Sequence, residues 1–337
     1  MSENKLNIII PMAGYGKRLR PHTWSKPKPL VSAAGKAVLG HVLDLVGSFA
    51  NPEDTEISFI IGYQGDQVRP YMEEHYPKIK TYYFEQKEMK GQSHAIAMAK
   101  EHLTGPTLIL FVDTIVDSDF SFLKDEEADA VIWVKEVKDP RRFGVVAVNE
   151  EGFVQGLIEK PESMDNRLAI VGYYYFAKGE ELLAAIDQQI KEELITKGEY
   201  FLADAMHLMI KQGLKMRPET VNVWQDAGLP DAVLETNRYL LGTGKDNTKD
   251  IVLSSTVEIH PPVYIHPSAQ IENATIGPNV SIGPGCIIAN SQIKETILEK
   301  DVEIKDANLH ESIIGERAKI SGVSGSMNIG DDATVVK

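Results

Sequence analysis

The sequence predicts an α/β domain built on a mostly parallel sheet, followed by a short parallel β-helix. Three observations lead to this fold class. Short apolar runs alternate with amphipathic helical patterns over about the first 240 residues, and a loop of glycines and cations follows the first apolar run. Near the C-terminus, isoleucines recur every five or six residues. At 337 residues the chain is long enough for roughly two domains.

Five short apolar runs predict the strands of the first domain. They are residues 7–12, 57–61, 108–112, 130–134 and 145–148. Residues 41–49 and 93–102 have the 3.6-residue spacing of amphipathic helices and fall between predicted strands. In such sheets ligands bind at the carboxyl ends of the strands, which is where the glycine-and-cation loop lies.

This loop follows the strand at residues 7–12 and contains Gly14, Gly16 and Arg18, with Lys28 further on. Glycines let backbone N–H groups approach an anion, while a guanidinium and an ammonium can bind a polyphosphate. The dinucleotide motif would need a glycine where Leu19 stands, and the Gly-Lys-Ser/Thr of a P-loop is absent. The sequence therefore predicts a nucleotide site of another kind.

The pattern changes after residue 241. Residues 242–255 are polar and contain glycine, which predicts a linker. Beyond them a hexapeptide period predicts a parallel β-helix of roughly three coils over residues 256–325, whose isoleucines point into the core. The clearest of these are Ile265, Ile271, Ile276, Ile282 and Ile288. The period stops at Ser326, so residues 326–337 are expected to form a loose or packing tail.

Charge and cysteine content narrow the class of protein. The chain has 35 basic and 49 acidic residues, a net charge of −14, which argues against a nucleic-acid or anionic-membrane surface. Its one cysteine, Cys286, permits no internal disulfide. The N-terminal apolar stretch is only about five residues, too short for a signal peptide or a membrane span. A cytoplasmic protein is expected.

The loop resembles the signature of the sugar-1-phosphate nucleotidyltransferases, in which a glycine loop precedes Arg-Leu-x-Pro-x-Thr, here residues 18–23, and Lys-Pro-Leu, here residues 28–30. The resemblance implies a Rossmann-like nucleotidyltransferase catalytic domain over residues 1–241 and a left-handed β-helix. It also implies attack of a sugar 1-phosphate on the α-phosphorus of a nucleoside triphosphate, with Arg18 and Lys28 as catalytic cations. The implied nucleotide-binding residues are Ala13, Gly14, Gly16, Lys17, Gln86 and Gly91.

The resemblance extends to a magnesium site. Asp113 ends the apolar run at residues 108–112, and Asp226 stands in a segment similar to the family's Trp-x-Asp-x-Gly-x-Pro, here residues 224–230. Two carboxylates with phosphate oxygens and water are suitable ligands for Mg²⁺, the implied cofactor. Val112 stands where the family usually has glycine.

Three further segments resemble the family's sugar-phosphate site: Phe-Gly-Val at 143–145, Glu-Lys-Pro at 159–161 and the run at 169–174. A fourth, residues 198–204, resembles Gly-Glu-x-x-x-Thr-Asp, with Ala203 replacing the threonine. The residues implied to bind the sugar phosphate are Gly144, Glu159, Lys160, Ile170 and Glu199.

Several alternatives remain open at this level. Glucose 1-phosphate with dTTP or UTP is favoured, with mannose 1-phosphate and GTP third; Lys17 fits neither pyrimidine group cleanly. A bifunctional enzyme could use His266 or His310 in acyl transfer, and Val112 and Ala203 raise the alternative of a non-catalytic sensor. By analogy with the family, the β-helix is expected to mediate formation of a homo-oligomer.

Overall fold

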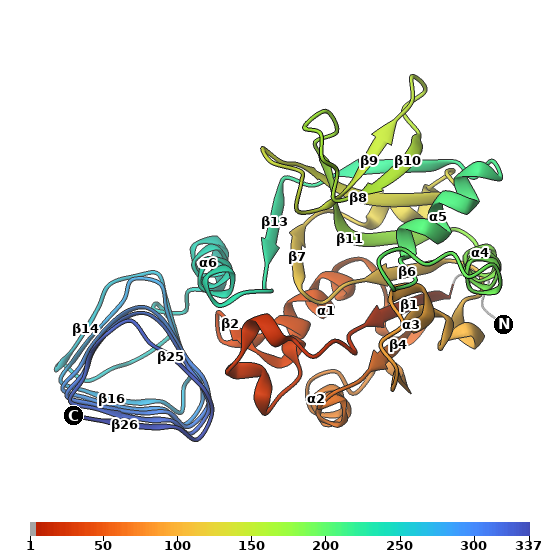
Figure 1. The fold of residues 1–337 in the computed structure, drawn as a ribbon. Coiled ribbons are helices and arrows are strands. Elements are labelled where there is room, and N and C mark those ends of the chain that lie inside the picture. The colour runs from red at the N-terminus through yellow and green to blue at the C-terminus, as the bar shows by residue number, and fades with distance from the viewer. Residues whose placement is uncertain (1–4) are drawn as a thin grey trace. The chain divides into compact units, whose positions relative to one another are not determined.

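The computed structural model describes residues 5–337, which form two compact units (Figure 1). Unit 1 consists of Met1–Gly14 and Val42–Trp224, and unit 2 of Tyr15–His41 and Gln225–Lys337. The predicted division at residue 241 therefore does not match these units, because residues 15–41 pack in the same unit as the β-helix.

Unit 1 is built on a nine-stranded sheet with the order β10-β9-β11-β6-β1-β4-β5, to which β8 is added beside β11 and β12 beside β8. These strands are β1 (Leu6–Pro11), β4 (Thr55–Ile61), β5 (Lys80–Glu85), β6 (Thr107–Leu110), β8 (Ala130–Glu136), β9 (Gly144–Val148), β10 (Val154–Glu159), β11 (Leu168–Phe176) and β12 (Met216–Thr220). The shorter strands β2 (Ser32–Ala33), β3 (Lys36–Ala37), β7 (Thr114–Asp117) and β13 (Val223–Asp226) lie outside this sheet. All five strands predicted from the sequence are present.

The centre of the sheet is parallel, since β1 pairs with both β4 and β6, and β4 with β5. Ile8, Ile9 and Ile10 of β1 are fully buried, as expected for a strand covered on both faces. Beyond β6 the sheet is mixed: β11 runs antiparallel to β6, β8 and β9. The carboxyl ends of β1, β4 and β5 therefore meet at one edge.

The helices are α1 (Val38–Phe49), α2 (Val68–His75), α3 (Gln92–Ala97), α4 (Gly179–Lys191), α5 (Leu202–Lys211) and α6 (Pro230–Leu240). The predicted helix at 41–49 lies within α1, and the one at 93–102 is α3 followed by a 3₁₀ turn at Lys100–His102. The buried faces of α4 and α5 complete the core of unit 1 through Leu182, Ile186, Leu202, Ala205 and Met206.

Unit 2 contains a parallel β-helix whose three faces show as a triangle in Figure 1. The first face consists of β14 (Val257–Ile259), β17 (Ala274–Ile276), the first half of β20 (Gln292–Leu298), the first half of β22 (Asn308–Ile314) and β24 (Ser324–Gly325). The second consists of β15 (Val263–Ile265), β18 (Val280–Ile282), the second halves of β20 and β22, and β25 (Asn328–Ile329). The third consists of β16 (Gln270–Glu272), β19 (Ile287–Ala289), β21 (Glu303–Lys305), β23 (Lys319–Ser321) and β26 (Thr334–Val336).

The predicted isoleucine period is confirmed as three stacks of side chains, consistent with the left-handed form that was expected. The stacks are Ile259, Ile276, Ile293, Leu309 and Gly325; Ile265, Ile282, Leu298, Ile314 and Ile329; and Ile271, Ile288, Ile304, Ile320 and Val335. Each buried aliphatic side chain packs on the equivalent position of the next coil, which gives the β-helix a continuous apolar core.

Two expectations about this region are wrong. The β-helix has five strands on each face within the described residues, not roughly three coils, and residues 326–337 are no loose tail. β25 and β26 continue the ladders of β22 and β23. The period is hard to recognise here because Gly325 takes an isoleucine position in the first stack.

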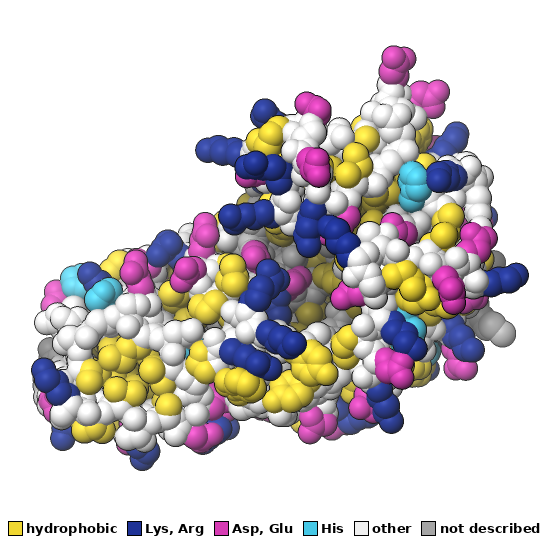
Figure 2. Space-filling model, in the orientation of Figure 1, with side chains coloured by type: hydrophobic (Ala, Val, Ile, Leu, Met, Phe, Trp, Pro, Cys, Tyr) yellow, Lys and Arg dark blue, Asp and Glu magenta, His cyan; other side chains and the backbone are white. Residues whose placement is uncertain are grey.

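The last coil is less well covered than the others. Val323, Met327, Ile329 and Val335 pack against the core of the β-helix but are only half-buried. Figure 2 shows hydrophobic side chains gathered over part of the β-helix and charges of both signs interspersed elsewhere on the same face. Across residues 5–337, no helix combines the length and the apolar character that crossing a membrane requires.

In unit 1, Glu56 on β4 is a buried carboxylate in a positively charged setting. It accepts hydrogen bonds from Lys5, from Lys80 Nζ at 2.8 Å and from Tyr82 Oη at 3.2 Å. Burial by itself would raise the pKa of Glu56, but the hydrogen bonds from Lys5 and Lys80 outweigh burial and lower it from 4.5 to about 2.

Because the folded pKa lies below the unfolded one, Glu56 contributes stability above about pH 4.5 that is lost as the pH falls toward 2. The variant Glu56→Gln should lower the free energy of unfolding by roughly 1–3 kcal/mol at pH 7. The difference in free energy of unfolding between this variant and the unmodified protein should shrink steadily below pH 4.5. Urea unfolding at several pH values measures this difference.

Asp139→Asn is the matched control. The pKa of Asp139 is also lowered to about 2, through hydrogen bonds from Arg141, but both side chains are exposed. Exposed pairs contribute little to stability, so this variant should unfold like the unmodified protein at every pH. An equal loss of stability in both variants would contradict the role of the buried site at Glu56.

Candidate functional site

In unit 1, β1 ends at Pro11 and leads directly into Ala13 and Gly14. The N–H of Met12 donates to the carbonyl of Ile60 at 2.9 Å, so the chain is still held beside β4 at this point. A Cβ atom on Gly62 would lie 2.4 Å from the carbonyl oxygen of Ala13, so a glycine is needed where the two strand ends approach each other. Gly14 has open space around it, which leaves its backbone accessible.

Gln86 follows β5 and is almost fully buried. Its Nε2 donates to the carbonyl of Gly91 at 3.2 Å and lies 3.1 Å from Nδ1 of His94. Burial, followed by the nearby charge of Lys90, lowers the pKa of His94, which favours the neutral ring and allows Nδ1 to accept. Both amide protons of Gln86 are thus used within the chain, which leaves its amide oxygen as the group able to accept a hydrogen bond.

Gly91 determines the shape of this loop. Its φ of 106° lies in a region that favours glycine, and a Cβ atom there would lie 2.6 Å from both the backbone N and O of Tyr200. Around it, Ser93 N–H donates to the Tyr200 carbonyl at 3.0 Å and Tyr200 N–H to the Lys90 carbonyl at 2.9 Å. The loop from 86 to 94 is therefore braced by the segment that follows Glu199.

The sugar-phosphate residues predicted from the sequence come together at one place on the sheet, with one exception. Gly144 begins β9 directly opposite Glu159 at the end of β10. A Cβ atom on Gly144 would lie 3.0 Å from Glu159 Oε2 and 3.2 Å from Cδ1 of Ile170. These residues and Lys160, whose N–H donates to the Phe143 carbonyl, form the cluster that we call the β9–β10 cluster.

Lys160 has a left-handed backbone, with φ of 51°. This conformation is unfavourable for a lysine and is found where the surroundings impose it, often at functional sites. Its Nζ lies 3.8 Å from Glu159 Oε1, and its side chain is 52% exposed. The ammonium is therefore held loosely beside a carboxylate and is accessible to an anion.

Glu199 is the exception. It is exposed, its backbone pairs with that of Thr196, and the described residues show no hydrogen bond or ion pair from it to the β9–β10 cluster. Ala203, which replaces the expected threonine, packs against the core of unit 1. The structure thus brings the segment after Glu199 to the Gly91 loop.

Asp113 lies between β6 and β7 and is half-buried, whereas Val112 before it is buried. Burial raises the pKa of Tyr174 on β11, and the charges of Glu159 and Asp113 raise it further. Tyr174 is thus close to both the β9–β10 cluster and Asp113. Val112, which departs from the family pattern, is buried, whereas Asp113 is partly exposed.

In unit 2, the loop after Gly14 is a series of short turns. Gly16 has a left-handed backbone, with φ of 59°, and precedes a 3₁₀ turn at Lys17–Leu19. Thr23 Oγ1 donates to the Gly16 carbonyl at 2.9 Å, and Leu19 is fully buried. Arg18 is exposed and makes no hydrogen bond or ion pair to any residue of the described chain, so its guanidinium is available to a ligand.

Lys28 begins a third 3₁₀ turn, Lys28–Leu30, after one at His22–Trp24. A Cβ atom on Gly228 would lie 3.4 Å from Lys28 Nζ and 2.8 Å from Asp226 Oδ1, so the three residues are neighbours. Asp226 Oδ1 accepts the N–H of Gly228 at 2.7 Å, whereas the N-cap of α6 is Leu229. Asp226 is therefore not a helix cap, and the residue is exposed.

The donor chemistry of Asp113 and Asp226 suits a hard cation, since carboxylate oxygens are the ligands that such cations prefer. They lie in different units, and no group of three or more His, Cys, Asp or Glu residues that could hold a metal exists within residues 5–337. The two carboxylates thus remain predicted ligands.

These features define an α/β protein that carries cationic, glycine-containing loops at strand ends, attached to a parallel β-helix. Residues 7–242 match the family model described as nucleotidyl transferase, so the chain belongs to the nucleotidyl transferase family. Residues 259–336 match a second model, described as GMPPB C-terminal domain.

Similar proteins agree with this assignment. The bifunctional protein GlmU of Methanocaldococcus jannaschii is 36% identical over 241 residues, which cover 70% of this chain and 54% of GlmU. The UTP–glucose-1-phosphate uridylyltransferase AglF of Haloferax volcanii is 27% identical over 233 residues, 67% of this chain and 93% of AglF. The chain thus spans about half the length of GlmU.

Among solved structures, a UDP-glucose pyrophosphorylase complexed with UDP-glucose is similar in fold, with a TM-score of 0.59 and 18% identity. The match covers 71% of this chain and all of that one. At this identity the likeness concerns the fold alone.

Gly91→Ala tests the geometry of the loop. The added Cβ would collide with the Tyr200 backbone in a conformation that alanine avoids. We expect the free energy of unfolding to fall by roughly 1–3 kcal/mol and the amides of Ser93 and Tyr200 to exchange with solvent at least tenfold faster. Urea unfolding and hydrogen exchange measure the two effects.

Gly152→Ala is the control, because Gly152 also has a positive φ, 87°, but nothing lies within 4 Å of its added Cβ. Gly152→Ala should lower the free energy of unfolding but leave the exchange rates of the Ser93 and Tyr200 amides unchanged. Unchanged exchange in Gly91→Ala would show that the close approach does not hold the loop.

Proposed function

We propose that this protein is a sugar-1-phosphate nucleotidyltransferase, which joins a hexose 1-phosphate to a nucleoside monophosphate and releases pyrophosphate. One observation supports this most directly: accessible cations occupy two separate loops, Arg18 after a left-handed glycine and Lys160 beside the hydroxyl acceptor Glu159. A reaction between two phosphorylated substrates needs this arrangement, because each phosphate requires its own cation. Membership of the nucleotidyl transferase family supports the same proposal.

On the nucleotide side, Arg18 and Lys28 would bind the triphosphate. Arg18 can form two parallel hydrogen bonds to phosphate oxygens, which suits the pyrophosphate as it leaves. Lys28, close to Asp226, would hold the region of the α-phosphate. Such displacements depend on alignment and charge stabilisation, and no side chain has to act as a nucleophile.

On the sugar side, Lys160 would bind the attacking phosphate while Glu159 accepts hydrogen bonds from ring hydroxyls. The absence of a side chain at Gly144 lets the Glu159 carboxylate and Ile170 lie close to the backbone, where the hexose would bind against them. Holding the phosphate oxygen near the α-phosphorus replaces a bimolecular encounter by an intramolecular one.

Asp113 and Asp226 are the proposed ligands of Mg²⁺. A bound Mg²⁺ would neutralise charge on the phosphate oxygens during the displacement. The hydrogen bond from Gly228 N–H to Asp226 Oδ1 would help to hold this carboxylate in place for the cation.

For the base we propose uracil or thymine. The Gln86 amide oxygen can accept from the N3–H that both bases carry, and the neighbouring His94 fixes the amide in that orientation. Glucose 1-phosphate is the proposed sugar substrate, in line with the name of AglF and with the UDP-glucose in the structurally similar pyrophosphorylase. Guanine has a corresponding N1–H, so GTP with mannose 1-phosphate is the alternative.

No observation favours acyl transfer by the β-helix. His266 Nδ1 lies 2.8 Å from Ser268 Oγ and 3.2 Å from Ser268 N, so this ring is engaged within a turn of the β-helix. The sensor alternative is weakened as well, because Val112 and Ala203 pack into the core of unit 1.

The proposal is tested by pyrophosphate release with Mg²⁺ for five nucleoside triphosphates against the 1-phosphates of glucose, mannose, galactose and N-acetylglucosamine. We expect turnover with dTTP or UTP and glucose 1-phosphate at least tenfold above other pairs. Turnover with GTP and mannose 1-phosphate alone would replace the substrate proposal. No turnover with any pair, while a nucleotide still binds, would favour the sensor.

Lys160→Met tests the sugar-phosphate role. Loss of a charged hydrogen bond of roughly 1.5–3 kcal/mol should raise KM for glucose 1-phosphate about 10- to 100-fold and leave KM for the nucleotide within about twofold. Lys178→Met is the control, since Lys178 is likewise exposed and paired with a carboxylate, that of Glu181. Equal effects on both Michaelis constants would contradict the assignment.

A further inference from the structure

The loop that carries Arg18 and Lys28 belongs to the same compact unit as the β-helix. Between these two cations lies Lys26, which is only 5% exposed. A lysine this buried is uncommon and requires partners that compensate its charge.

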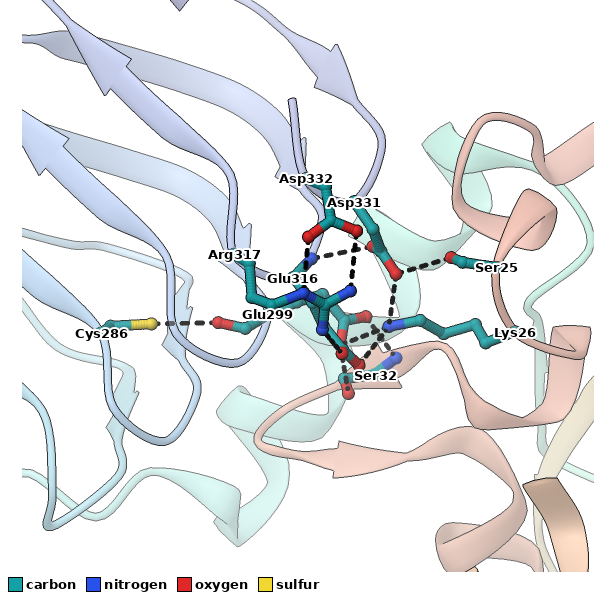
Figure 3. A network of polar contacts seen from close by, with 9 residues as sticks. All are labelled: Ser25, Lys26, Ser32, Cys286, Glu299, Glu316, Arg317, Asp331 and Asp332. Carbon is teal, nitrogen blue, oxygen red and sulfur yellow. Dashed lines mark hydrogen bonds and ion pairs between the residues drawn. The ribbon is translucent and has the colours of Figure 1, made fainter. Parts of the chain in front are cut away.

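The partners of Lys26 come from three successive coils of the β-helix (Figure 3). Its Nζ lies 2.6 Å from Glu316 Oε1, 3.4 Å from Glu299 Oε2 and 3.7 Å from Asp331 Oδ2. Glu299 directly follows β20, and the other two follow β22 and β25 at equivalent places. We call Lys26 and these three carboxylates the corner cluster.

The charges of the corner cluster depend on one another. Glu316 and Asp331 occupy equivalent positions of neighbouring coils, about 4.8 Å apart, and Glu299 contacts the same cation from the preceding coil. The carboxylates therefore repel each other unless a cation lies among them. Burial would lower the pKa of Lys26, but Glu299, Glu316 and Asp331 outweigh burial and raise it. Lys26 and Arg317 likewise lower the pKa of Glu316 against the effect of burial.

Further contacts hold the same stretch of chain. Ser25 Oγ donates to Asp331 Oδ2 at 2.6 Å, as Figure 3 shows, and Ser32 donates to Glu299 through its N–H at 3.0 Å and its Oγ at 3.1 Å. His22 Nε2 is hydrogen-bonded to Asn328 Oδ1. The loop is thus attached to the β-helix on both sides of Lys26.

The connection from Lys26 to Lys28 is stiff. Pro27 and Pro29 flank Lys28, and Pro27 is extended before the 3₁₀ turn begins. With φ fixed at two of three successive residues, the direction of the Lys26 side chain and the position of Lys28 are closely linked. Asp226 and Gly228 lie near Lys28 Nζ in the same unit.

We propose that Lys26 is a positioning residue that fixes the Arg18 and Lys28 loop on the β-helix, so that the β-helix supports the triphosphate site. This inference rests on the proposed nucleotidyltransferase function for its kinetic consequences. Its structural part, immobilisation of the loop by the corner cluster, can be measured without turnover.

The test compares Lys26→Met with Lys26→Arg. In Lys26→Met the loop should lose its anchor, so KM for the nucleotide should rise at least tenfold and kcat should fall, while KM for the sugar 1-phosphate stays within about twofold. Lys26→Arg retains a cation among the three carboxylates and should restore most of the nucleotide affinity. Ser25→Ala, which keeps every charge, should shift the nucleotide KM in the same direction by a smaller factor.

Two controls separate positioning from general destabilisation. Ile304→Val removes one methylene from the β-helix core, and Lys319→Met breaks the exposed pair of Lys319 with Glu303. Both should leave the nucleotide KM unchanged below their melting temperatures. A tenfold rise in either control, a wild-type nucleotide KM in folded Lys26→Met, or equal changes in both Michaelis constants would overturn the proposal.

Hydrogen exchange makes the result independent of the proposed function. In Lys26→Met the amides of residues 16–31 should exchange at least tenfold faster, while those of β20 and β22 stay protected. Unchanged exchange in the loop would refute the positioning role even in an active enzyme. Faster exchange in the loop of a chain that turns over no substrate pair would support the role of Lys26 and refute only the nucleotidyltransferase proposal.

If Lys26→Met does not fold, hydrogen exchange in Ser25→Ala tests the proposal instead. The amides of residues 16–31 should exchange faster in Ser25→Ala than in Lys319→Met. Equal exchange rates in the two variants would overturn the proposal.

Discussion

The pairing of β1 with a parallel strand on each side is the constraint on which unit 1 depends. Ile8, Ile9 and Ile10 have no solvent exposure, and β4 and β6 hold them in register. Because all three strands run in the same direction, their carboxyl ends and the loops that follow emerge at one edge of the sheet. This pairing determines the positions of Ala13 and Gly14, which follow β1, and of Asp113, which follows β6.

Close backbone approaches then determine what each loop can bind. Gly62 lets the end of β4 touch the carbonyl of Ala13, Gly91 accommodates the Tyr200 backbone, and Gly144 faces Glu159. In each case a Cβ atom would lie 3.0 Å or less from a neighbouring atom. At Gly62 and Gly91 the neighbouring atoms belong to the backbone, so a larger residue would displace the chain, and the position of Gln86 beside Gly91 depends on this close approach.

Unit 2 shows a different principle, in which a repeating scaffold arranges charges. Stacked isoleucines give the β-helix a rigid core, so residues at equivalent positions of neighbouring coils are forced close together whether or not their charges agree. Glu316 and Asp331 illustrate this, and Lys26 from a distant segment compensates both of them and Glu299 of the preceding coil. A solenoid can thus hold a loop whose own sequence contains no regular structure longer than a single turn.

Short-range sequence patterns determined the strands of unit 1 and the β-helix of unit 2. Apolar runs predicted the strands and the isoleucine period predicted the β-helix, because each pattern lies within a short stretch of chain. Family resemblance pointed to Gly144, Glu159 and Lys160 as sugar-phosphate residues, and the structure brings these three together. Only the tertiary structure decided the number of coils, because Gly325 replaces an isoleucine and conceals the period in the sequence. It also decided which residues lie near Glu199. It also revealed His94 as the acceptor for Gln86 and Lys26 as the centre of the corner cluster. The carboxylates around Lys26 are more than 270 residues away in the chain, and no local pattern can encode such a meeting.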